Sequence, residues 1–144
     1  MELIIIFTVI IFLIGTVSIA LPSKSAREIS NLRLEASKLG FKIVSSKLST
    51  QSFKNKDFSL VCYQLKNETN LKEAHFIRDK DDLILYSPLK LKYSEEYDEI
   101  NNKLKEVSNF VHEVIFSNAS IAFLWEEKAG IEELNKIRKS LEFF

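Results

Sequence analysis

The sequence contains few of the residues that build covalent cross-links and chemical sites. Its 144 residues include 1 cysteine, 2 histidines, 3 glycines and 2 prolines. A single cysteine, Cys62, excludes a disulfide within the chain, which fits a reducing compartment. Three widely separated glycines exclude a glycine-rich phosphate loop. So little glycine and proline is also atypical of a disordered chain, so we expect a folded domain.

The charge lacks an excess of either sign. There are 20 basic and 20 acidic residues, and the formal net charge is zero. Such a chain has no overall electrostatic attraction to nucleic acid. RNA binding on a sheet also needs basic residues interleaved with aromatic ones, and the predicted strands contain few lysines or arginines. We therefore expect no nucleic-acid partner.

One long apolar run is present near the beginning of the sequence. Residues 3–21 contain no charged side chain and are mostly Ile, Leu, Phe and Val. As a helix rising about 1.5 Å per residue, the run would span roughly 28 Å, close to the hydrocarbon thickness of a bilayer. A buried helix of a soluble protein normally keeps a polar stripe over such a length. The run therefore predicts a transmembrane anchor over residues 1–22.

A cleaved signal peptide is the alternative interpretation of this run. Ser18-Ile19-Ala20 fits the small-x-small cleavage pattern, which would release an exported domain after Ala20. A signal peptide, however, has a basic beginning and an apolar core of about 7–15 residues. Here the only early charged side chain is Glu2, and the core is longer. These differences favour an anchor that is retained.

Basic residues follow the apolar run, and none precedes it. Lys24 and Arg27 come directly after the run, and Arg33 and Lys38 lie farther along. Because basic flanks of a span stay in the cytosol, we predict that the N-terminus faces out and that residues 22–144 face the cytoplasm. Lys24 and Arg27 would then flank the lipid headgroups, with a lipid contact favoured for Lys24.

Small residues lie together near the end of the run. Thr16 and Ala20 are four residues apart, and Gly15 lies beside them. Such spacing lets the backbones of two membrane helices approach closely. We predict that any self-association or contact with a membrane partner inside the bilayer uses Gly15, Thr16 and Ala20.

Beyond the run, periodicity predicts short strands interleaved with helices. Residues 23–40 form an amphipathic helix, with Ser25 and Glu28 as a capping box and Gly40 as its stop. Strands are predicted at residues 41–48, 59–65, 74–78, 83–86, 111–116 and 121–125. Two further helices begin near residue 94 and after the last strand. This order predicts an α+β domain over residues 41–144, a small antiparallel sheet with helices packed on one face.

The predicted core combines one face of each element. Alternation along residues 59–65, and apolar residues spaced three or four apart in the helices, each select one apolar face. We expect these faces to be buried together. The residues predicted at their centre are Val61, Leu104, Phe123, Trp125 and Ile137.

Few residues are candidates for chemistry. His75 and His112 lie on predicted strands far apart in sequence, and His112-Glu113 lacks the second histidine of a zinc-protease motif. Cys62 alternates with Leu60 inside a strand, which favours a buried apolar role over a nucleophile. We therefore expect no metal, cofactor or catalytic site. The alternative is an enzyme whose site is assembled from scattered residues such as His75, His112 and Glu113.

Three stretches of the sequence carry a resemblance to a known family: LPSKSAREISNLRLEASKLGFKI, VCYQL and VIFSNASIAFLWEEKAGIEELNKIRKSL. In these stretches the chain resembles a family of small uncharacterised single-pass inner-membrane proteins of Gram-negative bacteria. In that family a basic helix with an Arg-Leu-Glu-Ala step follows the span, at residues 33–36 here. A hairpin with a Leu-Trp or Tyr-Trp pair precedes the last helix, at Leu124 and Trp125 here. The resemblance implies a location, the bacterial inner membrane, and no activity.

The layout is also similar to the auxiliary translocase subunit that has one span and a small β-rich cytoplasmic domain. Residues 21–24, Leu-Pro-Ser-Lys, stand here in place of that family's basic, glutamine-rich segment. An anchor joined to a domain without a catalytic constellation predicts a non-catalytic interaction or scaffold domain at the cytoplasmic face of the membrane. Its predicted contacts are membrane lipid through the span, and either a membrane protein or a second copy of the chain.

Overall fold

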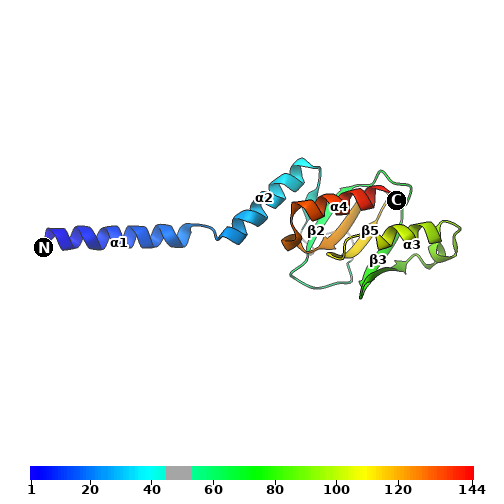
Figure 1. Ribbon diagram of the computed structural model, residues 1–144, viewed down its shortest axis with the longest axis horizontal. Helices are drawn as coiled ribbons and strands as arrows, with labels where there is room; N and C mark the ends of the chain where they lie inside the picture. Colours follow the sequence, from blue (N-terminus) through cyan, green and yellow to red (C-terminus); the bar gives the residue numbers. More distant parts are fainter. Residues whose placement is uncertain (45–52) are drawn as a thin grey trace. The chain divides into compact units, whose positions relative to one another are not determined.

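The computed structural model describes residues 1–44 and 53–144 (Figure 1). Contacts divide the chain into two compact units, Met1–Asn31 and Leu32–Phe144. The second unit begins at Leu32, inside a helix. The end of the strand predicted over residues 41–48, and the start of the loop after it, lie outside the described residues.

Helix α1 (Glu2–Ala20) is long and apolar enough to cross a membrane, with a mean hydropathy of 2.9, and is the one such helix in the part of the chain that the structure describes. None of its residues is buried. The hydroxyls of Thr8, Thr16 and Ser18 donate to carbonyl oxygens three or four residues earlier, at 2.8–2.9 Å. These three hydroxyls are therefore satisfied within the helix, as an apolar surrounding requires.

Helix α2 (Lys24–Lys38) begins one residue before Ser25, the predicted cap. The backbone N–H of Ala26 donates to Oγ of Ser23 at 3.2 Å, so Ser23 is the N-cap. The prediction that Ser25 caps this helix is wrong, because Ser25 already lies inside its first turn.

The end of α2 follows the prediction at Gly40, whose φ is +91°. The N–H of Phe41 donates to the carbonyl oxygen of Ala36, and the N–H of Gly40 donates to that of Ser37, both at 3.1 Å. This pair of hydrogen bonds is the Schellman motif, which needs a left-handed residue after the helix. Gly40 fills that position without the steric cost that a Cβ brings.

Replacing Gly40 by alanine is expected to lower the free energy of unfolding by about 1–2 kcal/mol, because an L-residue is strained at this positive φ. Apart from Gly40 itself and its two chain neighbours, no residue comes within 4 Å of a Cβ built there, so the loss would come from the local backbone alone. Urea unfolding of the full chain in detergent measures it. Gly40→Asn is the control, since asparagine tolerates the left-handed region, and an equal loss in both variants would contradict this explanation.

Six strands form one antiparallel sheet in the order β1-β2-β6-β5-β3-β4. The strands are β1 (Lys42–Val44), β2 (Val61–Lys66), β3 (Ala74–Asp79), β4 (Asp82–Ser87), β5 (Val111–Phe116) and β6 (Ser120–Trp125). The predicted hairpins β3–β4 and β5–β6 are confirmed. Strand β6 lies inside the sheet and is buried along its whole length.

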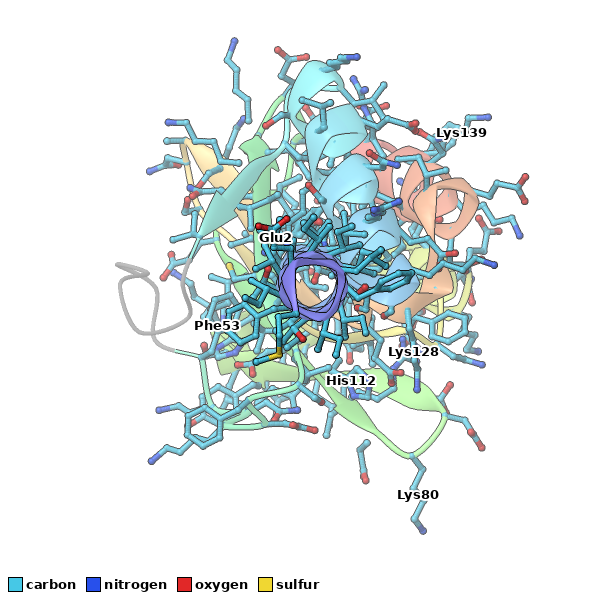
Figure 2. All side chains as sticks on the ribbon, turned by 90° about the vertical axis from the view of Figure 1, so that its left-hand side faces the viewer. Glu2, Phe53, Lys80, His112, Lys128 and Lys139 are labelled. Atoms are coloured by element: carbon cyan, nitrogen blue, oxygen red, sulfur yellow. The ribbon has the colours of Figure 1, made fainter. Side chains whose placement is uncertain are left out.

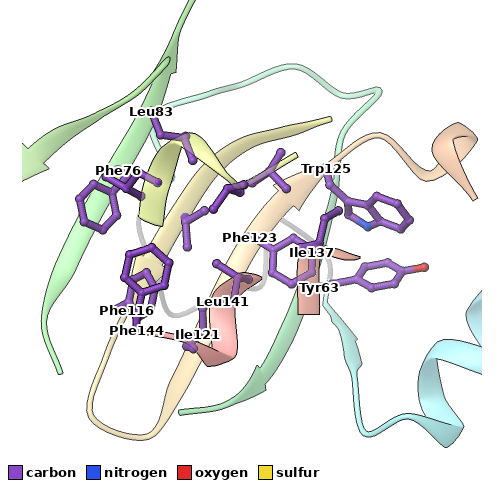
Figure 3. Close-up of a cluster of buried hydrophobic side chains, with 14 of the residues drawn as sticks. Tyr63, Phe76, Leu83, Phe116, Ile121, Phe123, Trp125, Ile137, Leu141 and Phe144 are labelled. Atoms are coloured by element: carbon purple, nitrogen blue, oxygen red, sulfur yellow. The ribbon is translucent and has the colours of Figure 1, made fainter. Parts of the chain in front are cut away.

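The helices pack against one face of this sheet, which confirms the predicted α+β class. Helix α3 (Tyr97–Lys105), helix α4 (Ile131–Glu142) and the second half of α2 all contribute to one core cluster (Figures 1 and 3). Short 3-10 helices, η1 (Leu89–Tyr93) and η2 (Glu127–Ala129), precede α3 and α4. The predicted core residues Leu104, Phe123, Trp125 and Ile137 are buried together, and Val61 is partly buried against them.

The face of the sheet away from the helices, its outer face, has an apolar layer of its own. We call it the smaller apolar layer; its buried members are Leu60, Cys62, Ala122 and Leu124. Phe53 packs against this layer from the segment before β2. The alternation predicted for residues 59–65 is thus confirmed, since Tyr63 joins the helix-side core while Cys62 joins the outer layer.

Candidate functional site

Two buried glutamates are the most unusual chemical features of the domain. Glu113 is 0 % exposed on the outer face of the sheet, and Glu127 is 9 % exposed on the helix side. Burying a carboxylate is costly unless hydrogen-bond donors or an opposite charge reach it. The donors around each glutamate therefore indicate what it does.

Glu113 is held by three N–H groups from two parts of the chain. The backbone N–H of Lys54 donates to Oε1 and that of Asn55 donates to Oε2, both at 2.8 Å. The third contact joins Oε1 to Nε2 of His75, on β3. The imidazole of His75 also packs against the ring of Tyr86, with centroids 5.0 Å apart. Both carboxylate oxygens of Glu113 are thus used.

His75 uses one of its two ring nitrogens, Nε2, for the contact with Glu113. The residue is 8 % exposed. An imidazole oriented by a carboxylate is a general-base arrangement. Within the described residues, however, no serine, threonine or cysteine lies within hydrogen-bond distance of His75.

The second histidine, His112, contacts a different glutamate, Glu126. Nε2 of His112 lies 2.8 Å from Oε1 of Glu126, and Nζ of Lys128 lies 2.7 Å from Oε2 of the same carboxylate. His112 and Lys128 accordingly lie side by side in Figure 2. The ammonium of Lys128 and then the imidazole of His112 hold the pKa of Glu126 below its usual value.

The structure thus brings together only two of the three residues proposed for a scattered enzyme site. His75 and Glu113 meet, but His112 pairs with Glu126 although it is the sequence neighbour of Glu113. The physical reason is a register shift in β5 between Val111 and Glu113, which places His112 as an extra residue in the strand.

Cys62 has the character expected of a buried apolar residue. It is 1 % exposed, and burial raises the pKa of its thiol to about 11. At neutral pH such a thiol carries very little thiolate, which is the nucleophilic form. Among the described residues, no group of three or more His, Cys, Asp or Glu side chains is arranged to hold a metal ion.

Glu127 joins the second half of α2 to the sheet. Nε and Nη2 of Arg33 donate to its two oxygens, each at 2.8 Å, and the hydroxyl of Tyr63 donates to Oε1 at 2.8 Å. The hydrogen bond to Glu127 is the main reason that the pKa of Arg33 is raised. Burial, followed by the hydrogen bond to Glu127, raises the pKa of Tyr63. In the sequence, Arg33 stands out only as a basic residue after the span and as the start of the Arg-Leu-Glu-Ala step, so this contact was not predicted.

The residues predicted to act at the membrane are exposed. Lys24 and Arg27 lie in the first turns of α2, and Gly15, Thr16 and Ala20 lie on α1. No atom comes within 4 Å of a Cβ built on Gly15, so that position is open. The roles of these five residues stay predictions.

No protein-family model, curated protein or solved structure matches the chain. The resemblance to small single-pass inner-membrane proteins therefore stays a prediction.

Proposed function

We propose that α1 anchors the chain in a membrane as a single span, and that the α+β unit acts there as a non-catalytic binding or scaffold domain. The observation that supports this proposal is α1 itself, with its mean hydropathy of 2.9 and with none of its residues buried. Exposing so much apolar surface to water is strongly unfavourable, whereas a bilayer accommodates a helix of this length.

The polar interior of the domain supports binding over catalysis. Glu113 and Glu127 accept hydrogen bonds from distant segments of the domain and so hold those segments together. Cys62 is buried and protonated. An enzyme is the second candidate, because His75 is oriented by Glu113 as a general base would be. It would need a nucleophile or water placed at Nδ1 of His75.

The proposed location is the cytoplasmic face of a bacterial inner membrane. Lys24 and Arg27 follow α1 and support an N-out orientation. The span would contact lipid, and Gly15, Thr16 and Ala20 would carry any contact with a partner inside the bilayer.

Fusing a reporter after Phe144 tests the orientation. We expect a fluorescent protein that folds only in the cytoplasm to be active, and a periplasm-dependent alkaline phosphatase to be inactive. The matched control replaces Lys24 and Arg27 by glutamine and adds two lysines after Met1, which should reverse part of the population. Phosphatase activity of the unmodified chain would contradict the orientation.

Fractionation with intact-mass measurement tests the anchor itself. The proposal expects the chain in the membrane fraction after alkaline washing, with α1 still attached. A soluble product whose mass begins at Leu21 would instead identify the run as a cleaved signal and the domain as exported.

A further inference from the structure

Residues 53–60, which we call the strap, cross the outer face of the sheet without forming a helix or strand. Phe53 and Leu60, at its two ends, pack on the smaller apolar layer that contains Cys62. Between them, the backbone N–H groups of Lys54 and Asn55 reach down to the buried carboxylate of Glu113. Nζ of Lys54 also lies 5.5 Å from the ring centroid of Tyr86 on β4. The strap is therefore held by apolar contacts at its ends, and near its start by the carboxylate of Glu113 and this exposed cation–π contact.

The remaining hydrogen bonds described for the middle of the strap stay within it. The N–H of Asp57 donates to Oδ1 of Asn55, and the N–H of Ser59 donates to Oδ1 of Asp57, both at 2.9 Å. The N–H of Leu60 donates to the carbonyl oxygen of Asp57 at 3.3 Å. These bonds shape the strap and leave it one compact piece. The two backbone hydrogen bonds described between the strap and the sheet both go to Glu113.

These two hydrogen bonds depend on the negative charge of Glu113. An ionised carboxylate accepts hydrogen bonds on both oxygens, so it satisfies Lys54 and Asn55 together. His75 shares Oε1 and fixes the orientation of the carboxylate. An amide at this position would present an NH2 group to one of the two backbone donors. One buried N–H would then have no acceptor, which favours release of the strap.

We propose that the strap is a movable cover, latched by Glu113, whose opening exposes Cys62 and the smaller apolar layer while the helix-side core stays folded. The smaller apolar layer is separate from the core that the helices cover, so opening would disrupt only a few buried contacts. Local openings of this kind have lower free energies than global unfolding. The proposal is independent of the membrane and of the orientation of α1.

Labelling of Cys62 measures the opening directly, because it is the single thiol in the chain. The experiment follows the reaction of the full chain, in detergent, with a neutral disulfide reagent at fixed pH. We expect Glu113→Gln to label about ten- to a hundred-fold faster than the unmodified chain. The rate should depend weakly on urea, since local opening exposes little surface.

Glu127→Gln is the matched control, because it removes the charge of the other buried glutamate, which does not contact the strap. We expect this variant to change labelling only through global unfolding, with a steep dependence on urea. Equal acceleration in both variants, or no acceleration in Glu113→Gln, would overturn the latch. A steep urea dependence in Glu113→Gln would also overturn it.

If Glu113→Gln does not fold, hydrogen exchange of the backbone amides of the unmodified chain tests the latch instead. We expect the amides of Lys54 and Asn55 to be protected, yet to exchange at least ten-fold faster than the amides of β6. Exchange of these two amides at the rate of β6 would mean that the strap opens only on global unfolding. Absence of protection would mean that Glu113 does not hold it.

Discussion

Replacing Phe123 by alanine is expected to lower the free energy of unfolding by about 3–5 kcal/mol, the usual loss for a large aromatic residue in a filled core. Phe123 is 0 % exposed in β6, between β2 and β5. Its ring lies 6.0 Å from that of Phe41 and 6.2 Å from that of Tyr63, measured between centroids. Figure 3 draws Phe123 beside Tyr63. The cavity would thus open in the centre of the sheet, where neighbouring strands cannot move in to fill it.

Urea unfolding of the full chain in detergent, followed by the fluorescence of Trp125, measures this loss. Phe143→Ala is the control, because Phe143 is 71 % exposed and its loss should change stability by less than about 0.5 kcal/mol. If the two variants unfold at the same urea concentration, the assignment of Phe123 to the centre of the core is wrong.

Removing the guanidinium of Arg33 is expected to cost about 2–4 kcal/mol. Arg33→Met keeps much of the apolar stem but leaves the buried carboxylate of Glu127 with Tyr63 as its described side-chain donor. Breaking a buried ion pair by removing one partner typically costs about 3–5 kcal/mol. The expected value is lower because the side chain of Arg33 is 46 % exposed, so water can reach the vacated side of Glu127.

A double-mutant cycle with Glu127→Gln separates the pair from the loss of either residue alone. We expect the double variant to be more stable than the sum of the two single losses predicts, because neither charge is then left unpaired. Lys103→Met is the control, since the pair of Lys103 with Glu99 lies on the solvent side of α3 and should contribute no measurable stability. Strict additivity of Arg33→Met and Glu127→Gln would contradict a coupled pair.

Local periodicity was enough to predict most of the elements. Leu134 and Ile137 lie one turn apart on α4, and both are fully buried as their spacing predicts. The hairpin β5–β6 follows from two apolar segments around a short polar turn. Such signals are local, because a residue's neighbours along the chain determine which face of a helix or strand it occupies.

The partners of the buried glutamates could not be predicted in the same way. Alternation places Glu113 on the face opposite Val114, which normally indicates solvent. The strap, which is distant in sequence, contacts Glu113 on that face, and the position is buried. Similarly, Glu126 and Glu127 are adjacent acids after β6, and nothing local indicates that Glu127 is the one to meet Arg33. These contacts depend on the order of strands, which periodicity does not determine.

The position of hairpin β5–β6 in the sheet has a consequence for when the domain can fold during synthesis. Strand β1 pairs with β2 and strand β3 pairs with β4, but these two pairs are not neighbours in the sheet. Strand β6 joins the first pair through β2, and strand β5 joins the second pair through β3. Until β6 has left the ribosome, the nascent chain therefore has two small groups of strands, β1–β2 and β4–β3–β5, with open edges and no hydrogen bonds between them. If α1 enters the membrane first, those strand edges stay unpaired near the membrane surface. Chaperones or a neighbouring nascent chain could bind them there before β6 joins the two groups.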